Sequence, residues 1–430
     1  MTTSARGGDQ PYRIRPVSPE EFDAFHTVDM HAFHGSPLSD DDRQVVTDRL
    51  EFDRSLAAFD GGMLVGTAAA YSFQLTVPGR QVLPTAGVTW VSVLPSHRRR
   101  GVLSSMMRRQ LADVRDRGEP VAVLWASESV IYSRYGYGRA MWHADFTLHR
   151  GEGTLARTAP ADGGLRLRLP DPAAALPELA KVYETVLPAR PGFIARNELW
   201  WRGLVYDPPD RRHGTSPLRC VLAEDDSGPR GYALYSAVNR WDSDTSLPDG
   251  TLNVREMVSA DAAASAAMAA DLLSRDLTTE FRIRGRPVDD PLLYQLADPR
   301  RARPRLKDAL WVRIIDVPGA LARRRYSGPA DAVIEVRDDL LPSNAGRWRL
   351  TTADAAADGG GLEASCVPAG AADRADVVLD VTSLGSAYLG GTPLGALAAA
   401  GLVTEGRPGA VRQLSAALSW DLAPWCPVNF

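Results

Sequence analysis

The amino-acid sequence predicts an α+β protein in which three mixed α/β regions follow one another. Three observations lead to this fold class. At 430 residues the chain is too long for a single hydrophobic core. Helical and strand-like patterns alternate along it. The composition also changes twice, to a Gly-, Ala-, Thr- and Asp-rich stretch over residues 151–164, which indicates a linker, and to a basic, proline-containing stretch over residues 298–304. We therefore expect domains over residues 1–150, 151–300 and 301–430.

The first region is predicted to alternate helices and strands. Ser18 can cap a helix whose first turn holds Glu20 and Glu21, and carboxylates are favoured at that end. Asp60-Gly61-Gly62 is typical of a hairpin turn. The expected elements are helices over Pro19–Phe33 and Leu103–Val114 and strands over Leu56–Phe59, Met63–Phe73, Val82–Leu94 and Val121–Trp125. The last strand is wholly apolar, as if buried on both faces, and completes a βαβ-like unit.

The two later regions are predicted to mix helices and strands as well. In the second region we expect helices over Pro172–Val186 and Ala260–Arg275 and strands over Arg219–Ala223, Arg230–Val238 and Thr251–Val258. In the third region we expect strands over Asp331–Arg337, Arg347–Thr352 and Val377–Val381 and helices over Thr382–Leu389 and Leu394–Ala400.

Composition and cysteine usage argue against several classes of protein. The formal net charge of -4 makes no electrostatic case for nucleic acid or for an anionic membrane surface. Cys220, Cys366 and Cys426 lie far apart, which argues against a zinc site and a disulfide scaffold and fits a reducing cytoplasm. The polar segment Met1–Gln10 lacks the apolar stretch of a secretory signal, and no apolar run is long enough to span a membrane. We expect a soluble, cytoplasmic protein without a metal.

One segment has the pattern of a phosphate site. A Val-rich strand ends at Pro95, and Arg98-Arg99-Arg100-Gly101 opens the helix that follows. The unpaired N–H groups and partial positive charge of a helix N-terminus bind pyrophosphate, and Gly101 lets the backbone approach it closely. Arg98 and Arg99 can add charge-assisted hydrogen bonds. Without its context, the same segment is a basic surface turn before a structural helix.

The run from Val91 to Val102 resembles the acetyl-CoA motif of the GNAT superfamily, in which a Val-rich strand and a short turn precede Q/R-x-x-G-x-G/A at a helix start. The resemblance implies that the strand lies beside the pantetheine and that the helix start holds the pyrophosphate. It assigns to acetyl-CoA the strand residues Val91 and Val93 and the turn residues Arg98, Arg99, Gly101 and Val102. Leu103 departs from the motif, which has Gly or Ala at that position.

A narrower resemblance covers nearly the whole chain. Residues 97–103, 126–128 and 131–138 are similar to segments of the Eis (enhanced intracellular survival) family of actinobacterial acetyltransferases, and so are residues 75–79, 83–87, 231–235, 310–318 and 384–391. This implies a catalytic GNAT domain, a second GNAT-like domain without a cofactor site and a C-terminal domain similar to a sterol carrier protein. It also implies a homo-hexamer. Arg282-Ile283-Arg284-Gly285 agrees with the missing second site, because prolines rather than a helix follow it.

The resemblance further implies an N-acetyltransferase in which a primary amine (an aminoglycoside, polyamine or lysine-type amine) attacks acetyl-CoA directly. Tyr132 matches the family's general acid, which protonates the departing thiolate, and a phenol of pKa about 10 suits that task. Ser127 would contact acetyl-CoA, and the N–H of Val93 would polarise the thioester carbonyl. We interpret Tyr135 and Tyr137 as packing aromatics.

The family's general base is the carboxylate at the C-terminus of the chain, which here belongs to Phe430. The segment 424–430 is largely apolar and contains two prolines, which suits docking in a pocket better than fraying in solvent. The residues expected to bind the amine acceptor depart from the family. Asn429 stands where the best-known members have Glu, and no Trp precedes Trp90. Asp29 and Asp40–Asp42 could supply carboxylates, although a solvated loop suits the latter three. We expect a less acidic pocket and a different range of amines.

Two other classes of function compete with catalysis. The small apolar residues within 395–402 could line a lipid cavity, as in a lipid-binding carrier, or could pack a core. A non-catalytic member that senses acyl-CoA would keep the phosphate turn but would have no need of Tyr132 and Phe430.

Overall fold

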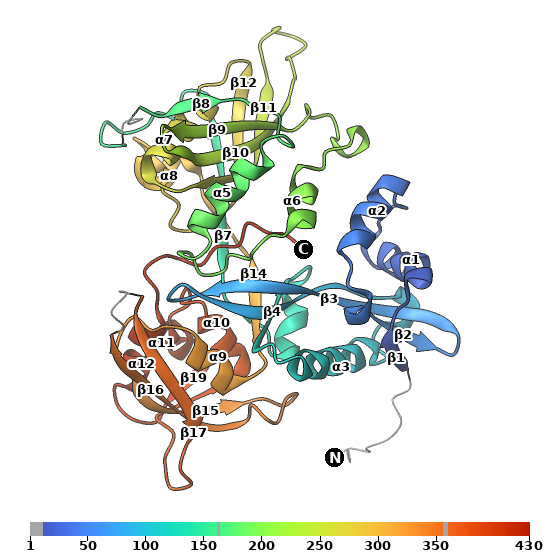
Figure 1. The fold of residues 1–430 in the computed structure, drawn as a ribbon, viewed down its shortest axis with the longest axis vertical. Helices are drawn as coiled ribbons and strands as arrows, with labels where there is room; N and C mark the ends of the chain where they lie inside the picture. The colour runs from blue at the N-terminus through green and yellow to red at the C-terminus, as the bar shows by residue number, and fades with distance from the viewer. Residues whose placement is uncertain (1–11, 161–163, 356–359) are drawn as a thin grey trace.

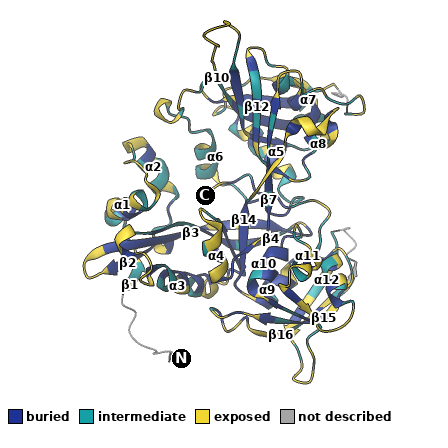
Figure 2. Ribbon diagram, turned by 180° about the vertical axis from the view of Figure 1, so that it is seen from behind, coloured by how far each residue is buried: buried dark blue, intermediate teal, exposed yellow. Residues whose placement is uncertain are grey.

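The computed structural model describes residues 12–160, 164–355 and 360–430, so the segment Met1–Gln10 discussed above and residues 161–163 of the expected linker lie outside it. Three β-sheets organise the described chain (Figure 1). Two of them have seven strands and the third has five. The strands are mostly buried and the helices lie against them (Figure 2). This is the α+β architecture that the sequence predicts.

The first sheet has the strand order β1-β2-β3-β4-β5-β14-β6. Helix α1 (Phe22–Phe33) packs on one face and α3 (Val102–Asp116) on the other, because successive residues of a strand point to opposite sides. Ala69 joins the apolar cluster of α1, whereas Ala68 joins that of α3. The strands are β1 (Arg13–Pro16), β2 (Leu56–Asp60), β3 (Met63–Val77), β4 (Gln81–Val93), β5 (Val121–Trp125), β14 (Leu310–Ile314) and β6 (Gly138–Arg139). The region also contains α2 (Asp40–Arg49), α4 (Ser129–Tyr132) and 3-10 turns at Pro19–Glu21, Phe52–Arg54, Pro95–His97 and Ser133–Tyr135.

The second sheet has the order β13-β7-β12-β11-β10-β9-β8. Its strands are β13 (Arg305–Asp308), β7 (Trp142–His149), β12 (Thr278–Pro287), β11 (Gly250–Ser259), β10 (Gly228–Val238), β9 (Arg219–Asp225) and β8 (Arg166–Arg168). Its helices are α5 (Leu176–Val186), α6 (Glu198–Val205), α7 (Ala262–Leu273) and α8 (Leu292–Gln295), with 3-10 turns at Pro209–Arg211 and Pro299–Ala302. Arg282 and Gly285 lie inside β12, so no helix opens at that R-x-x-G segment.

The third sheet has the order β17-β16-β15-β18-β19. Its strands are β15 (Asp331–Arg337), β16 (Gly346–Ala355), β17 (Leu362–Pro368), β18 (Val377–Asp380) and β19 (Val403–Glu405), and its helices are α9 (Val317–Arg323), α10 (Val381–Ala387), α11 (Leu394–Ala399) and α12 (Ala410–Leu418). Gly395 and Ala398 line an open groove of about 700 Å³, and Ala398 also packs against the core. The small residues of this segment therefore line a groove and pack a core at once.

Most predicted elements are confirmed. The strands expected over Val121–Trp125 and Asp331–Arg337 have those bounds. Parallel pairing of β4 with β5 across α3 confirms the βαβ unit. The first predicted helix is divided, because residues 19–21 form a 3-10 turn and α1 begins only at Phe22.

Helix α2 differs from the sequence prediction. The solvated loop expected for Asp40–Asp42 is instead the first turn of this helix, where the Ser39 hydroxyl accepts a hydrogen bond from the N–H of Asp42 at 3.2 Å. Asp42 is buried, because the Tyr206 hydroxyl donates to it at 3.0 Å and Arg211 pairs with it at 3.0 Å. Carboxylates stabilise a helix N-terminus, so three aspartates after a serine cap form a helix start.

Strands cross the domain limits expected at residues 150 and 300. Strand β7, which ends before residue 150, pairs with β12 and β13 in the second sheet. Strand β14, which follows residue 300, lies between β5 and β6 in the first. Cutting the chain at those residues would remove β14 from the first sheet and both β7 and β13 from the second. The domain limits at residues 150 and 300 thus remain a prediction, and the boundaries between the sheets do not coincide with them.

A buried ion pair ties the third region to the first sheet. Arg313 of β14 is fully buried and its Nη2 lies 2.8 Å from Asp338. Asn344 donates to the same carboxylate and to the carbonyl of Ile314, each at 3.0 Å. A buried charge that loses its partner costs about 3–5 kcal/mol, so this contact fixes where the C-terminal region sits.

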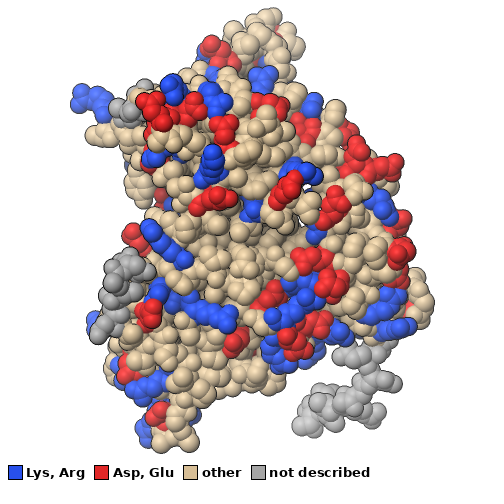
Figure 3. All heavy atoms as spheres, viewed as in Figure 1, with Lys and Arg blue, Asp and Glu red and all other residues tan. Residues whose placement is uncertain are grey.

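The C-terminus ends at the centre of the molecule, beside α6 and above β3 and β4 (Figure 1). Figure 3 shows basic and acidic side chains mixed over the same face, with a largely uncharged centre. Within the described residues, no helix has both the length and the apolar character needed to cross a membrane.

Candidate active site

The site begins where two parallel strands separate. Residues Thr85–Val88 of β4 pair with Val121–Leu124 of β5, and β4 then continues alone on that side to Val93. A bulge opposite β3 bends β4 at the same point, and Trp90 adopts a left-handed φ of 51°. The Thr67 hydroxyl holds the bulge by donating to the carbonyl of Trp90 at 2.7 Å. The separation leaves backbone groups of β4 without a strand partner beside an open groove.

The arginine turn lies at one end of this groove. Gly101 is the N-cap of α3 and has a φ of 87°, a conformation that glycine adopts without strain. A Cβ on Gly101 would meet no atom within 4 Å, so the space above the helix start is open. His97 fixes the turn from below, because its two ring nitrogens lie 2.9 Å from the Ser96 hydroxyl and 3.2 Å from Asp60. The first N–H groups of α3 therefore face open space.

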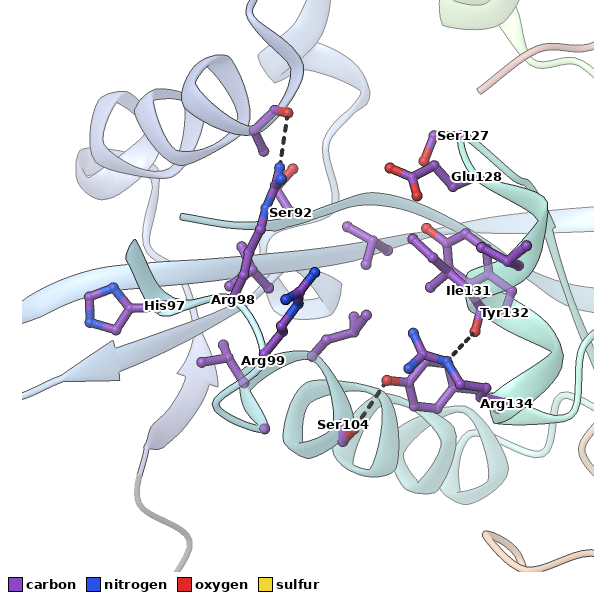
Figure 4. Close-up of a pocket in the computed structure, with 18 of the residues that line it drawn as sticks. Ser92, His97, Arg98, Arg99, Ser104, Ser127, Glu128, Ile131, Tyr132 and Arg134 are labelled. Atoms are coloured by element: carbon purple, nitrogen blue, oxygen red, sulfur yellow. Dashed lines mark hydrogen bonds between the residues drawn. The ribbon is translucent and has the colours of Figure 1, made fainter. Parts of the chain in front are cut away.

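A cavity of about 460 Å³ joins the strand to the turn (Figure 4). All the residues that the resemblance assigns to acetyl-CoA line this cavity: Val91, Val93, Arg98, Arg99, Gly101, Val102 and Ser127. Leu103, the residue that departs from the GNAT motif, lines it as well. The structure thus brings together every cofactor residue predicted from the sequence.

Arg134 is a lining residue that sequence reasoning missed. It follows Tyr132 by two positions, and its side chain reaches the same cavity as Arg98 and Arg99 (Figure 4). The Arg98 guanidinium donates to the carbonyl of Ala32 at 3.5 Å, and that of Arg134 to the carbonyl of Ile131 at 3.4 Å. None of the three makes an ion pair within the described ranges, although Glu128 lines the cavity too. Three arginines and a helix N-terminus fit a pyrophosphate and a further phosphate.

Tyr132 stands at the other end of the cavity, at the end of α4, with only 5% of its surface exposed. Burial raises the pKa of its phenol to about 12, and an interaction with the Ser127 side chain opposes that shift. The phenol therefore keeps its proton throughout the neutral range. This side chain combines burial with access to a cavity, as a proton donor requires.

The neighbouring tyrosines differ in their surroundings. Tyr137 is fully buried, packs edge to face on Tyr132 at a centroid distance of 6.1 Å, and lines neither cavity of the site. Its packing role is as the sequence predicts. The Tyr135 hydroxyl lies 3.1 Å from the Ser104 hydroxyl, so it links the 3-10 turn after α4 to α3, and its side chain also lines the first cavity.

A second cavity of about 370 Å³ lies beside the same strand. It shares four lining residues with the first, namely Phe33, Val91, Ser127 and Tyr132. Phe430 and Asn429 line it, as does Asp29, whereas Asp40, Asp41 and Asp42 do not. The two cavities therefore meet at Tyr132, with the C-terminal residue of the chain in the second one.

The C-terminal segment is held along its length rather than frayed. Near its start, Arg190 donates to the carbonyl of Ala423 at 2.7 Å, and the Trp425 indole donates to the carbonyl of Gly285 at 2.7 Å. Closer to the end, the Trp125 indole of β5 donates to the carbonyl of Val428 at 3.1 Å. The docking expected from the two prolines is confirmed in these contacts.

The Phe430 ring is anchored by aromatic packing. It meets the Phe73 ring edge to face at a centroid distance of 4.9 Å. A Cβ on Gly87 would lie 2.2 Å from the Phe73 ring and 3.3 Å from the Phe430 ring, so both rings depend on a glycine at this position of β4. The ring therefore has a defined place on the strand that lines both cavities.

No cysteine takes part in this arrangement. Cys220, Cys366 and Cys426 are buried and free, and none of them lines either cavity. Burial raises the pKa of the Cys426 thiol to about 12. No cysteine thiolate is therefore available as a nucleophile in these cavities, although Cys426 lies only four positions before Phe430.

Comparison with known proteins agrees with this geometry. Residues 13–140 and residues 192–314 each match a family model described as an acetyltransferase (GNAT) domain, and residues 317–427 match one described as a sterol carrier protein domain. The chain is 42% identical over 417 residues to a protein of Streptomyces avermitilis named as an uncharacterized N-acetyltransferase, covering 97% of this chain and 99% of that one.

Two further relatives extend the comparison to the Eis proteins. N-acetyltransferase Eis of Mycobacterium tuberculosis is 35% identical over 368 residues, which cover 84% of this chain and 85% of that protein. The crystal structure of Eis1 from Mycobacterium abscessus superposes with a TM-score of 0.80 at 35% identity and covers 97% of this chain and 100% of its own. With two GNAT domains, a sterol carrier protein domain and this identity over most of its length, the chain belongs to the Eis family of GNAT N-acetyltransferases, whose acetyl donor is acetyl-CoA.

Proposed function

We propose that the protein transfers the acetyl group of acetyl-CoA to a primary amine by direct attack, with Tyr132 as general acid and the Phe430 carboxylate as general base. The observation that carries this proposal is the meeting of two cavities at Tyr132, one with the arginine turn and the other with the C-terminal residue. A donor in the first cavity and an acceptor in the second would meet there, and such positioning accounts for much of enzymatic rate enhancement.

The first cavity would take acetyl-CoA. Its pyrophosphate would lie on the helix start at Gly101 and Val102, paired with Arg98 and Arg99, and the pantetheine would run along Val91 and Val93 beside Ser127. The backbone N–H of Val93 would donate to the thioester oxygen as negative charge develops on it. Arg134 would add a third cation toward the phosphates.

The proposed reaction consists of one bond formed, one bond broken and two proton transfers. The amine nitrogen forms a bond to the thioester carbon, the carbon–sulfur bond breaks, Tyr132 gives its proton to sulfur, and the terminal carboxylate takes a proton from the amine. The proton held by the carboxyl group then returns to the Tyr132 phenolate through solvent. The products are an acetamide and CoA thiol. The absence of a cysteine from both cavities supports this direct route over a covalent enzyme intermediate.

A panel of acceptors tests this function. CoA release and acetamide formation are expected for at least one of benzylamine, an aminoglycoside, spermidine and a lysine peptide, with acetyl-CoA as donor. Acetyl-CoA binding without acetamide from any amine would refute the proposal and favour an acyl-CoA sensor. We also propose, on the resemblance alone, a homo-hexamer in the cytoplasm. Sedimentation of the purified protein as anything else would contradict that assembly.

Arg134 gives a specific prediction about the donor cavity. Replacing it by Ala is expected to raise KM for acetyl-CoA about tenfold or more, since hydrogen bonds to charged groups contribute about 1.5–3 kcal/mol. The difference should shrink as salt is added, because partly exposed charges are screened. Arg108→Ala on an exposed position of α3, outside the cavity, is the matched control. Equal KM values for both variants would contradict a phosphate contact at Arg134.

A further inference from the structure

The charges of the second cavity point to a particular kind of amine. This inference rests on the proposed function, because it takes the second cavity as the place of the acceptor. Two charged side chains line the cavity, Asp29 and Arg49, and the remaining lining side chains are aromatic, aliphatic or neutral polar. A polyamine would find only Asp29 and the terminal carboxylate to pair with, and it would have to approach a guanidinium.

Arg49 is held at the cavity without an anionic partner. It ends α2, its Nε donates to the carbonyl of Val45 at 3.1 Å, and its guanidinium lies over the Trp200 ring of α6 at 5.1 Å. It makes no ion pair with a carboxylate of the described chain. The nearby Glu51 is engaged elsewhere, because both of its oxygens accept from Ser72 at 2.6 Å. The guanidinium thus keeps its bonding capacity toward the cavity.

Room for this guanidinium is part of the fold. A Cβ on Gly203 of α6 would lie 2.7 Å from Nη1 of Arg49, so the side chain has its place between α2 and α6 because position 203 is a glycine. Helices α2 and α6 contact each other, and the C-terminus lies just below α6 in Figure 1. An anionic group bound by Arg49 would therefore lie near α2 and α6.

Asp29 supplies the opposite charge in the same cavity. Its carboxylate accepts a hydrogen bond from the Ser92 hydroxyl at 2.6 Å, and burial raises its pKa above the ordinary value. An ammonium group can pair with this carboxylate or with the terminal one. The cavity thus has one cationic side chain and one anionic side chain on different elements, α2 and α1.

The walls between these charges are aromatic. Phe33, Tyr71, Trp90, Trp125, Trp200 and Phe430 all line the cavity. They are held by one another and by hydrogen bonds: Trp200 meets Tyr71 edge to face at 5.1 Å, and the Trp90 indole donates to the Tyr71 hydroxyl at 3.4 Å. Rigid aromatic walls favour a flat apolar body, which stacks on them at little entropic cost.

We infer that the acceptor is a small primary amine with a flat apolar body and an anionic group, a carboxylate or a phosphate, that pairs with Arg49. The amine end would lie toward Tyr132 and the terminal carboxylate, and the anionic end would lie toward α2. An acceptor of this kind satisfies the unpaired guanidinium, whereas a polycation is repelled by it.

Three probes of one shape test the inference: 4-(aminomethyl)benzoate, benzylamine and 4-(aminomethyl)benzylamine, which differ only in the charge opposite the reacting amine. We expect the wild-type kcat/KM to be about tenfold or more higher for the benzoate than for benzylamine, and lowest for the diamine. 4-(Aminomethyl)phenylphosphonate separates phosphate-like from carboxylate recognition. In Arg49→Gln the ratio of benzoate to benzylamine should fall close to one.

Arg43→Gln is the matched control, because Arg43 lies on the same helix, pairs with Asp23 and does not line the cavity. It should keep the wild-type ratio. A wild-type preference for the diamine, or a benzoate preference that survives in Arg49→Gln, would overturn the inference while leaving amine acetylation intact. If acetyl-CoA binds but no probe and no amine of the wider panel is acetylated, the proposed function itself fails.

Discussion

Replacing Tyr132 by Phe is expected to lower kcat for amine acetylation about 10²- to 10⁴-fold, the range that a positioned proton donor contributes. The substitution removes only the hydroxyl, so the ring keeps its packing on Tyr137 at 6.1 Å. Without the phenol, sulfur would have to leave as an unprotonated thiolate at the junction of the two cavities. Steady-state CoA release at saturating acetyl-CoA and amine measures the loss, and a kcat within a few-fold of wild type would contradict the assignment.

Tyr137→Phe is the matched control for this experiment. The Tyr137 hydroxyl is buried without a hydrogen-bond partner in the described chain, and it lines neither cavity. Removing an unsatisfied buried hydroxyl is close to neutral or stabilising, so both kcat and thermal stability should stay near wild type. Acetyl-CoA binding to Tyr132→Phe, measured by calorimetry, should also be retained. Loss of binding would mean that the substitution disturbs the cavity rather than proton transfer.

The raised pKa of Tyr132 predicts how kcat should depend on pH if Tyr132 is the general acid. Burial raises the phenol pKa to about 12, so its protonated form persists well above neutral pH, and no fall in kcat is expected up to about pH 10. The rate should instead rise with pH as the acceptor ammonium loses its proton. A general acid with an ordinary phenol pKa would begin to fail near pH 10, so the two cases differ in the alkaline arm of the profile.

Local patterns predicted the donor side of the site because its residues are neighbours in the chain. The strand, the turn at Arg98–Gly101 and the start of α3 follow one another directly, and a helix N-terminus binds anions wherever it occurs. Asp40–Asp42 carry an equally local signal, a serine cap followed by carboxylates. Their polarity suggested a solvated loop, but tertiary contacts with Tyr206 and Arg211 bury Asp42.

The acceptor side depends on residues that no local pattern joins. The hydrogen bond from Trp125 to Val428 spans 303 positions, and the place of β14 between β5 and β6 brings the third region under the first sheet. Arg49 and Trp200 meet only because α2 and α6 pack against each other. Resemblance to a family supplied the role of Phe430, but the aromatic walls of this pocket and the arginine beside them could be recognised only in the fold.

Moving the terminal carboxylate is expected to have the second large effect. Adding one glycine after Phe430 displaces the carboxylate by up to about 3.3–3.6 Å, more than the reach of a hydrogen bond, while the Phe430 ring can stay against Phe73. We expect kcat to fall about 10²-fold or more, with KM for acetyl-CoA nearly unchanged because Phe430 does not line the donor cavity. Steady-state kinetics with both substrates varied separates the two constants.

A loss of kcat in the extended enzyme could come from a misplaced general base or from a C-terminal segment that no longer docks, and controls must distinguish the two. Asp421→Asn removes an exposed carboxylate from the same end of the chain without touching either cavity, and it should leave kcat unaffected. Added formate or acetate should restore part of the rate of the extended enzyme by taking the proton in place of the lost carboxylate, a rescue that a disordered segment would not allow. An extended enzyme with full kcat would remove the terminal carboxylate from the mechanism, and the attacking amine would then lose its proton to Asp29 or to water.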